Sequence, residues 1–227
     1  KSPSRTKSAF VSGQHKISNK SLLIILTPII KNKILVILEL YYTKYEAKLL
    51  EYIFISLPKL ETDRIILRKL EYSDKSDIFE YAQNPNVAKY VLWEPHQDEL
   101  DTLEFLNMVY ASYNKNKAAP WGIQIKNDSK IIGTIGFIHW YIDKKEAEVG
   151  YALAEKYWNN GFVTEALEKV LDFGFEKMNL NKITARCLPE NSASIKVLEK
   201  SGFKFEDKSK MFVKGKLTSI NFYSLEK

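Results

Sequence analysis

Apolar residues recur at two different periods along residues 58–227, and the change of period divides this region into strands and helices. Alternating apolar and polar positions predict strands with one buried face at residues 64–68, 120–126, 131–140, 146–153, 182–188, 203–213 and 217–225. Apolar positions three and four residues apart predict helices at residues 74–84, 98–114, 162–178 and 191–201. Strands and helices are mixed along the chain, so we expect one domain of the α/β (α+β) class.

The central stretch, residues 146–178, is predicted to form a strand, a short loop and a helix. Asn159, Asn160 and Gly161 tolerate a left-handed backbone, and the helix begins directly after them. The N–H groups of a first helical turn have no partner within the helix, and the helix dipole adds positive potential there. The loop therefore predicts a phosphate site. It is neither a P-loop nor a dinucleotide-binding loop, because it lacks a Gly-Lys-Ser/Thr sequence and a second glycine.

Two motifs resemble the acetyl-CoA-binding segments of the GNAT superfamily of N-acetyltransferases, in the RimJ/RimL-like branch that acetylates ribosomal-protein N-termini. The first is Glu148-Val-Gly-Tyr-Ala-Leu153 with Trp158-Asn-Asn-Gly-Phe-Val163 and Thr164-Glu-Ala166. The second is Asn191-Ser-Ala-Ser194 followed by Gly202-Phe203. The resemblance covers residues 58–227. It implies the GNAT fold, a mixed and mostly antiparallel sheet of roughly six to seven strands with about four helices, whose splayed central strands hold acetyl-CoA.

The resemblance also implies which residues bind acetyl-CoA. The pyrophosphate would lie on the N–H groups of the loop, the pantetheine arm would pair with the strand end like an added strand, and Asn191 would hydrogen-bond that arm. The implied acetyl-CoA-binding residues are Tyr151, Ala152, Leu153, Trp158, Asn159, Asn160, Gly161, Phe162, Val163 and Asn191.

The function implied is transfer of the acetyl group to a primary amine, either a protein N-terminal α-amine or a small-molecule amine. Glu148 matches the acidic residue proposed as general base in this branch, and Ser194 matches a serine that protonates the thiolate. The alternative for Glu148 is an exposed strand glutamate paired with a lysine. The alternative for Ser194 is a hydroxyl on the helix surface, with water protonating the thiolate.

A loop at residues 91–96 would border the acceptor groove, so Trp93, Glu94 and His96 are candidate substrate contacts; a packed structural loop is the alternative.

Three positions depart from the family pattern. Asn159 stands where glycine is usual, and Val163 stands where glycine or alanine is usual. Leu198 stands where many GNAT enzymes have a tyrosine acid. Because a β-branched residue at the helix start could crowd the pyrophosphate, a CoA-binding regulatory module without turnover is the alternative function.

The net charge of +6 belongs to one part of the chain. Residues 1–57 hold 9 Lys/Arg and 3 Asp/Glu, which leaves 25 of each kind for residues 58–227. The main domain therefore has no excess of basic residues that would predict a nucleic-acid partner. The partners expected are acetyl-CoA and an amine acceptor, in a monomer or a homodimer.

Residues 1–57 form a basic extension with apolar runs at 22–30 and 34–40, and we place its boundary near Leu57. Pro28, Lys31, Lys33 and Glu39 interrupt these runs, so a membrane-spanning helix is not expected. No small-x-small cleavage site follows, which argues against a signal peptide. The sequence does not identify a role for this extension.

The single cysteine, Cys187, cannot form an internal disulfide or a zinc cluster by itself. We therefore expect a reducing, cytoplasmic environment, a buried thiol and no metal. His139, near the end of a strand, is expected to be a surface or structural residue.

Overall fold

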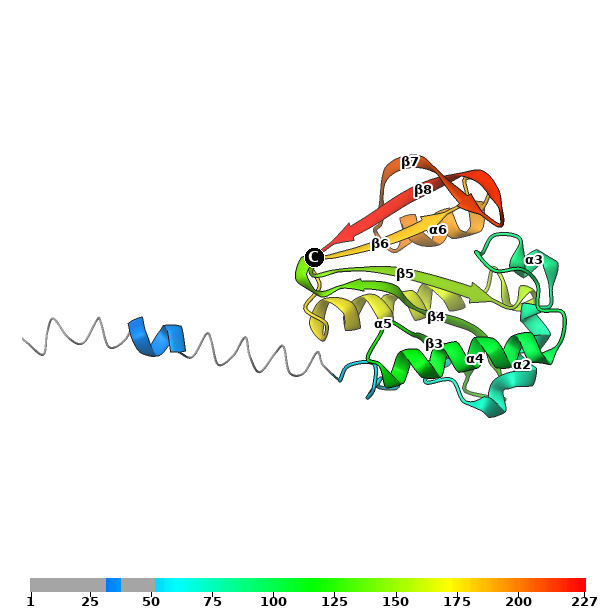
Figure 1. Cartoon of the computed structure of the whole chain (residues 1–227), viewed down its shortest axis with the longest axis horizontal. Helices are drawn as coiled ribbons and strands as arrows, with labels where there is room; N and C mark the ends of the chain where they lie inside the picture. The colour runs from blue at the N-terminus through cyan, green and yellow to red at the C-terminus, as the bar shows by residue number, and fades with distance from the viewer. Residues whose placement is uncertain (1–31, 38–51) are drawn as a thin grey trace, which may run out of the picture. The chain divides into compact units, whose positions relative to one another are not determined.

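The computed structural model describes residues 32–37 and 52–227 (Figure 1). The chain divides into two compact units, Lys1–Leu49 and Leu50–Lys227. In the first unit, residues 32–37 form a short exposed helix; most of the apolar runs noted in the sequence lie outside the described residues. The described residues contain no helix that is long and apolar enough to cross a membrane.

The second unit includes residues that precede the boundary near Leu57. Phe54 and Leu57 are buried in its core, and the N–H of Phe54 donates to Oδ1 of Asn116 at 2.8 Å. The indole N–H of Trp121 donates to the carbonyl of Pro58 at 2.8 Å. The segment before the first strand is therefore part of the folded domain, and the division of the chain into an extension of unknown role at 1–57 and a domain at 58–227 stays a prediction.

One eight-stranded sheet, in the order β1-β2-β3-β4-β5-β6-β8-β7, organises this unit. All neighbouring pairs are antiparallel except β5 and β6, which are parallel. The strands are β1 (Leu60–Glu61), β2 (Ile65–Arg68), β3 (Pro120–Ile125), β4 (Ile131–Tyr141), β5 (Glu146–Leu153), β6 (Lys182–Cys187), β7 (Lys204–Val213) and β8 (Lys216–Glu226). The mixed, mostly antiparallel GNAT sheet is confirmed; strand β1 adds to the expected number because two residues cannot show an alternating pattern.

Five α-helices of this unit flank the sheet: α2 (Lys75–Ala82), α3 (Pro85–Ala88), α4 (Glu99–Asn114), α5 (Phe162–Glu176) and α6 (Ser192–Lys200). Helix α4 is capped by Asp98, whose carboxylate accepts from the N–H groups of Leu100 and Asp101. Asp74 is the N-cap position of α2, but its side chain makes no cap bond there. It belongs to the preceding 3₁₀ turn, Tyr72–Asp74, and accepts from the N–H of Glu71 at 2.7 Å.

Helices α2 and α5 pack on opposite faces of the sheet. On β4, Thr134 hydrogen-bonds Tyr81 of α2, whereas Phe137 lies against Gly174 of α5. Successive residues of a strand point to opposite faces, so Thr134 and Phe137, three residues apart on β4, point to opposite faces of the sheet. The sheet is therefore covered on both sides around β4 and β5, which buries the middle of the domain.

Strands β5 and β6 run side by side only at their beginning (Figure 1). Their pairing starts at Glu146–Lys182 and ends at Glu148–Thr184, after which the two strands diverge. Opposite this point, β4 has a bulge between Phe137 and His139, and a bulge increases the local twist of a strand. The expected splay of the central strands is confirmed, and it leaves one backbone edge of β5 beyond Glu148 without a strand partner.

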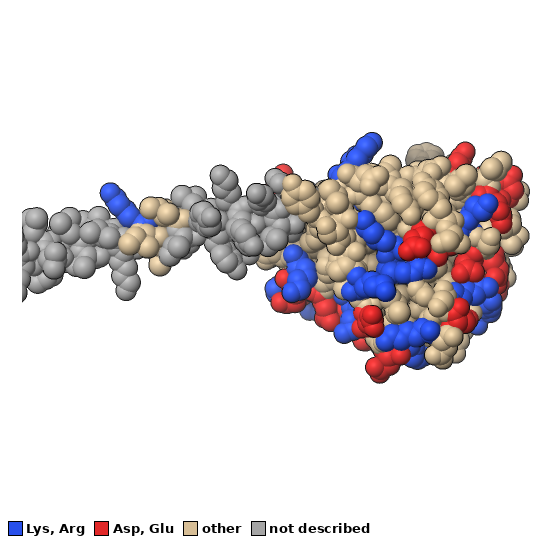
Figure 2. Space-filling view, turned by 90° about the horizontal axis from the view of Figure 1, so that it is seen from below, with Lys and Arg blue, Asp and Glu red and all other residues tan. Residues whose placement is uncertain are grey.

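Basic and acidic side chains are interspersed over the face seen in Figure 2. No single-sign patch covers this face, as the equal numbers of basic and acidic residues in 58–227 predict.

Candidate functional site

The loop between β5 and α5 has the predicted left-handed residues. Asn159 has φ 61° and Gly161 has φ 79°, and α5 begins at the next residue, Phe162. The indole N–H of Trp158 donates to the carbonyl of Leu153 at 2.8 Å, which fastens the loop to the end of β5. The unpaired N–H groups of the first turn of α5 therefore lie at a fixed place beside the open edge of β5.

Arg64, just before β2, contacts both this loop and the first turn of α5. Its Nε donates to Oε2 of Glu165 at 2.7 Å, and a terminal nitrogen donates to the carbonyl of Asn160 at 2.9 Å. Its guanidinium also lies 4.4 Å from the ring centroid of Phe162, a cation–π contact. The sequence analysis did not find this role, because Arg64 and the loop are almost a hundred residues apart.

A first cavity of about 430 Å³ lies between the strand end, the loop and helix α6. Of the ten residues assigned to acetyl-CoA from the sequence, only Asn160 does not line it. Val163 is among the lining residues, so a β-branched side chain does border the cavity. Among the described residues that line it, Lys196 and Lys200, one helical turn apart on α6, are the only charged ones, and the sequence analysis missed both.

A second cavity of about 490 Å³ lies beside the first. The two share six lining residues: Tyr90, Val91, Tyr151, Ala152, Asn191 and Ser194. Trp93 and Glu148 line the second cavity alone. The two cavities therefore meet where β5 leaves β6, with Ser194 at the junction and Glu148 in the second cavity.

Glu148 is 8% exposed and forms an ion pair with Arg186, whose Nε donates to Oε1 at 2.6 Å. Arg186 lies on β6, so the ion pair joins the two strands at the point where they diverge. This arrangement differs from the alternative of an exposed glutamate paired with a lysine. Burying the pair costs desolvation, and the direct hydrogen bond offsets this cost.

Ser194 lies in the first turn of α6, where Asn191 is the N-cap. The Oδ1 of Asn191 accepts from the N–H of Ser194 at 3.0 Å, which leaves the Nδ2 group of Asn191 as a donor for a ligand. The Ser194 hydroxyl hydrogen-bonds the phenol of Tyr151 at 2.8 Å. Burial raises the pKa of Tyr151, so the phenol stays neutral. Leu198, at the position of the family's tyrosine, is buried in the core.

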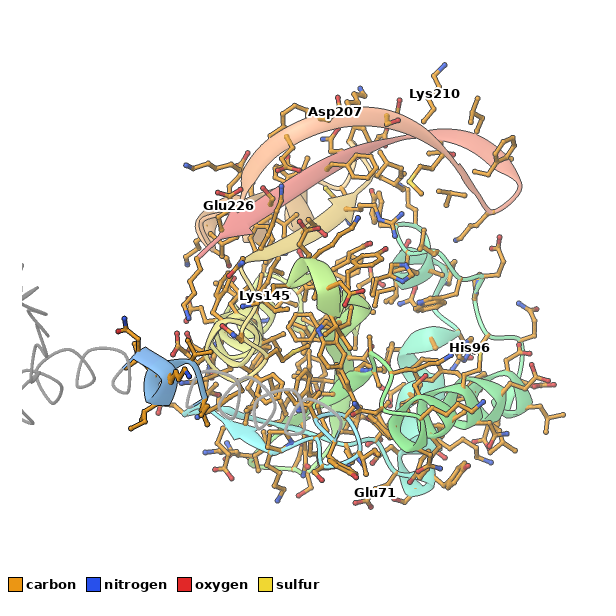
Figure 3. All side chains as sticks on the ribbon, turned by 60° about the vertical axis from the view of Figure 1, so that its left-hand side comes forward. Glu71, His96, Lys145, Asp207, Lys210 and Glu226 are labelled. Carbon is orange, nitrogen blue, oxygen red and sulfur yellow. The ribbon has the colours of Figure 1, made fainter. Side chains whose placement is uncertain are left out.

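The three candidate substrate contacts lie in the loop after α3, but their side chains lie in different surroundings. Trp93 lines the second cavity. Glu94 points outward, with a side chain 69% exposed and a carboxylate 3.7 Å from Nζ of Lys214. His96 hydrogen-bonds Oγ1 of Thr102 at 2.8 Å and lines neither cavity. Figure 3 shows His96 beside the helices, away from β7, where Asp207 and Lys210 lie.

Cys187 is a buried free thiol, as expected, and His139 is exposed. Burial raises the pKa of the Cys187 thiol to about 11, from an ordinary value of 9.0. At pH 8 its thiolate fraction is thus about 100-fold below that of a free cysteine, and iodoacetamide should alkylate it about 100-fold more slowly. The measurement compares the folded protein with the same protein in urea. Equal rates in the two states would contradict this account of the thiol.

Among the residues that the structure describes, no group of three His, Cys, Asp or Glu side chains could hold a metal ion.

Residues 64–204 match the family model of the acetyltransferase (GNAT) domain. The chain belongs to the GNAT acetyltransferase family. It is 34% identical over 170 residues to the uncharacterized N-acetyltransferase p20 of Bacillus licheniformis, covering 74% of this chain and 96% of that one. The resemblance read from the two sequence motifs is confirmed.

Two ribosomal-protein acetyltransferases are similar to this GNAT chain, one in sequence and one in fold. The uS5-alanine N-acetyltransferase of Escherichia coli is 25% identical over 162 residues, which span 68% of this chain and 82% of the relative. The solved structure of RimL, an L7/L12 α-N-protein acetyltransferase in complex with coenzyme A, superposes with a TM-score of 0.68 at 18% identity. That match covers 74% of this chain and 98% of RimL, and at this identity it supports the fold alone.

Proposed function

We propose that this acetyltransferase moves the acetyl group of acetyl-CoA to a primary amine by direct attack of the amine, with Glu148 as general base and Ser194 as general acid. The observation that carries the proposal is the meeting of the two cavities at the point where β5 and β6 part. One cavity has the loop and strand edge that suit a nucleotide thioester. The other has a buried carboxylate that suits an amine.

The first cavity fits acetyl-CoA in charge and in hydrogen-bonding groups. The N–H groups at the start of α5 suit the pyrophosphate, and the open edge of β5 at Tyr151–Leu153 suits the amides of the pantetheine arm. Lys196 and Lys200 add two positive charges to a cavity without acidic side chains. When bound, acetyl-CoA supplies the activated acyl group for the reaction.

Amide formation requires the loss of a proton from the amine and the protonation of the leaving thiolate. Glu148 is the one carboxylate that the described residues place in the second cavity, so it is the group that can take the proton of an ammonium ion there. Ser194 lies at the junction, and its bond to the Tyr151 phenol orients its hydroxyl. A backbone N–H near Gly150 and Tyr151, on the edge of β5 that β6 has left, would polarise the acyl carbonyl.

The test uses all 227 residues of the chain given by the sequence. Calorimetric titration with acetyl-CoA is followed by measurement of thiol release with small amines and with ribosomal-protein N-terminal peptides. We expect binding and thiol release that depends on an added amine. Binding with no thiol release from any amine would reject the transfer reaction and favour a CoA-binding module.

The double variant Lys196→Ala/Lys200→Ala is expected to raise the KM for acetyl-CoA about 10-fold with little change in kcat, since a charge-assisted contact to phosphate contributes roughly 1.4 kcal/mol. Steady-state kinetics with acetyl-CoA and with its analogue lacking the 3′-phosphate would check this. The variant should lose its preference between the two donors if the lysines contact that phosphate.

The matched control is Lys208→Ala/Lys210→Ala on β7, which removes the same charge outside both cavities. If KM rises equally in this control, the effect comes from the change in net charge and not from contacts made by α6.

A further inference from the structure

We infer that the acceptor is a free α-amino acid with an apolar side chain, whose amine meets Glu148 and whose carboxylate meets Arg186. The inference rests on the proposed function and names its substrate class. Glu148 and Arg186 are adjacent, so the amine and the carboxylate of one α-carbon can reach both. The apolar wall of the second cavity would take the side chain.

Exposed apolar side chains gather at the second cavity. Leu92, Ile138 and Phe212 line it and are 60%, 44% and 78% exposed. They come from the loop after α3, the bulge of β4 and the end of β7, so three separate elements contribute apolar surface to one place. Such a gathering on an otherwise charged surface is typical of a binding site. Trp93 and Phe105 extend the same wall inward.

The charges of this cavity exclude polycationic acceptors. In the described part of the chain, Glu148 and Arg186 are its only charged lining residues, and they neutralise each other. A polyamine or an aminoglycoside would bring several cations into a cavity that has one carboxylate, already paired. Burying a cation without a partner is costly. An acceptor with one amine and one carboxylate keeps the charges balanced.

Arg186 has hydrogen-bond donors that suit a carboxylate. Its Nε is committed to Glu148, and one terminal nitrogen contacts only Sδ of Met211 at 3.3 Å, a weak acceptor. Within the described residues, no hydrogen bond is found for its other terminal nitrogen. The two terminal nitrogens form a planar fork that binds a carboxylate through two parallel bonds. The side chain is 19% exposed, so such a bond would be largely shielded from water.

A bridge at one side of the cavity favours a small acceptor. Nζ of Lys214, in the turn between β7 and β8, donates to the carbonyl of Ala88 in α3 at 2.8 Å. The tip of this hairpin and the α3 region are therefore joined, and Figure 1 shows them near each other. The bridge limits the room for a long peptide on this side, and a cavity of about 490 Å³ has room for one amino acid.

The experiment measures thiol release by the full chain with L-phenylalanine, L-leucine, phenethylamine, spermidine and an alanine-initiated peptide. We expect kcat/KM for L-phenylalanine to exceed that for phenethylamine about 10-fold or more, because only the amino acid has a carboxylate for Arg186. A higher kcat/KM for phenethylamine, spermidine or the peptide would overturn the inference while leaving amine acetylation intact. No thiol release with any amine would instead defeat the proposed function.

The variant Arg186→Gln separates carboxylate binding from a structural role. It should lower kcat/KM for L-phenylalanine about 10-fold more than for phenethylamine, mainly through KM. The control Lys208→Gln on β7 should leave this ratio unchanged, since Lys208 lines neither cavity. If Arg186→Gln lowers both activities equally, Arg186 serves only to position Glu148, and the assignment of the carboxylate is wrong.

Discussion

Glu148→Gln is expected to lower kcat by about 100-fold or more with little change in the affinity for acetyl-CoA, as loss of a general base predicts. The amide keeps the shape of the side chain, and its oxygen can still accept from Arg186. What it loses is the ability to take a proton from the amine. Single-turnover thiol release and calorimetric titration with acetyl-CoA measure the two quantities separately.

The matched control is Glu146→Gln, two residues earlier on the same strand. Glu146 lines neither cavity, although it lies two residues from Glu148 on β5 and therefore on the same face of the strand. Its substitution should leave kcat unchanged. A turnover of Glu148→Gln near that of the unchanged protein would remove Glu148 from the mechanism, provided that both variants melt at the same temperature.

Most of the strands and helices could be predicted because their signals are local, whereas the arrangement of the sheet was implied by the resemblance to the GNAT family. The alternation at residues 146–153 predicted β5, and Asn159 and Gly161 predicted the left-handed loop that the structure contains. The helices predicted from residues 98 and 191 begin directly after their N-caps, Asp98 and Asn191, and an N-cap acts within three residues. Each of these predictions needed only neighbouring residues.

The candidate site was harder to predict because its contacts join distant parts of the chain. Arg186 is 38 residues from Glu148, and Tyr151 is 43 residues from Ser194. The register of β5 with β6 decides the first contact, and the packing of α6 decides the second. Neither is encoded in a local pattern. Lys196 and Lys200 did show helical spacing, but only the cavity distinguishes them from a solvated pair.

Asp74→Ala should destabilise the fold by about 3–5 kcal/mol, because it leaves a buried cation without its partner. Arg68 donates two parallel hydrogen bonds to the Asp74 carboxylate, at 2.8 and 2.7 Å, and the two side chains are 15% and 7% exposed. This ion pair raises the pKa of Arg68, so the guanidinium keeps its charge. Urea unfolding with a constant m-value would measure the loss. Glu99→Ala, which breaks the exposed pair with Lys75, should change the midpoint very little.

The double variant Arg68→Met/Asp74→Leu tests whether the loss comes from the unpaired charge or from the missing bonds. Apolar replacements of both partners remove the hydrogen bonds but leave no buried ion, so the double variant should lose less stability than Asp74→Ala alone. A loss in Asp74→Ala of under about 1 kcal/mol would mean that the guanidinium reaches water once its partner is gone. A double variant less stable than the single one would mean that the other hydrogen bonds of Arg68, to the Gln124 side chain and to the Lys69 carbonyl, stabilise the fold by more than its unpaired charge costs.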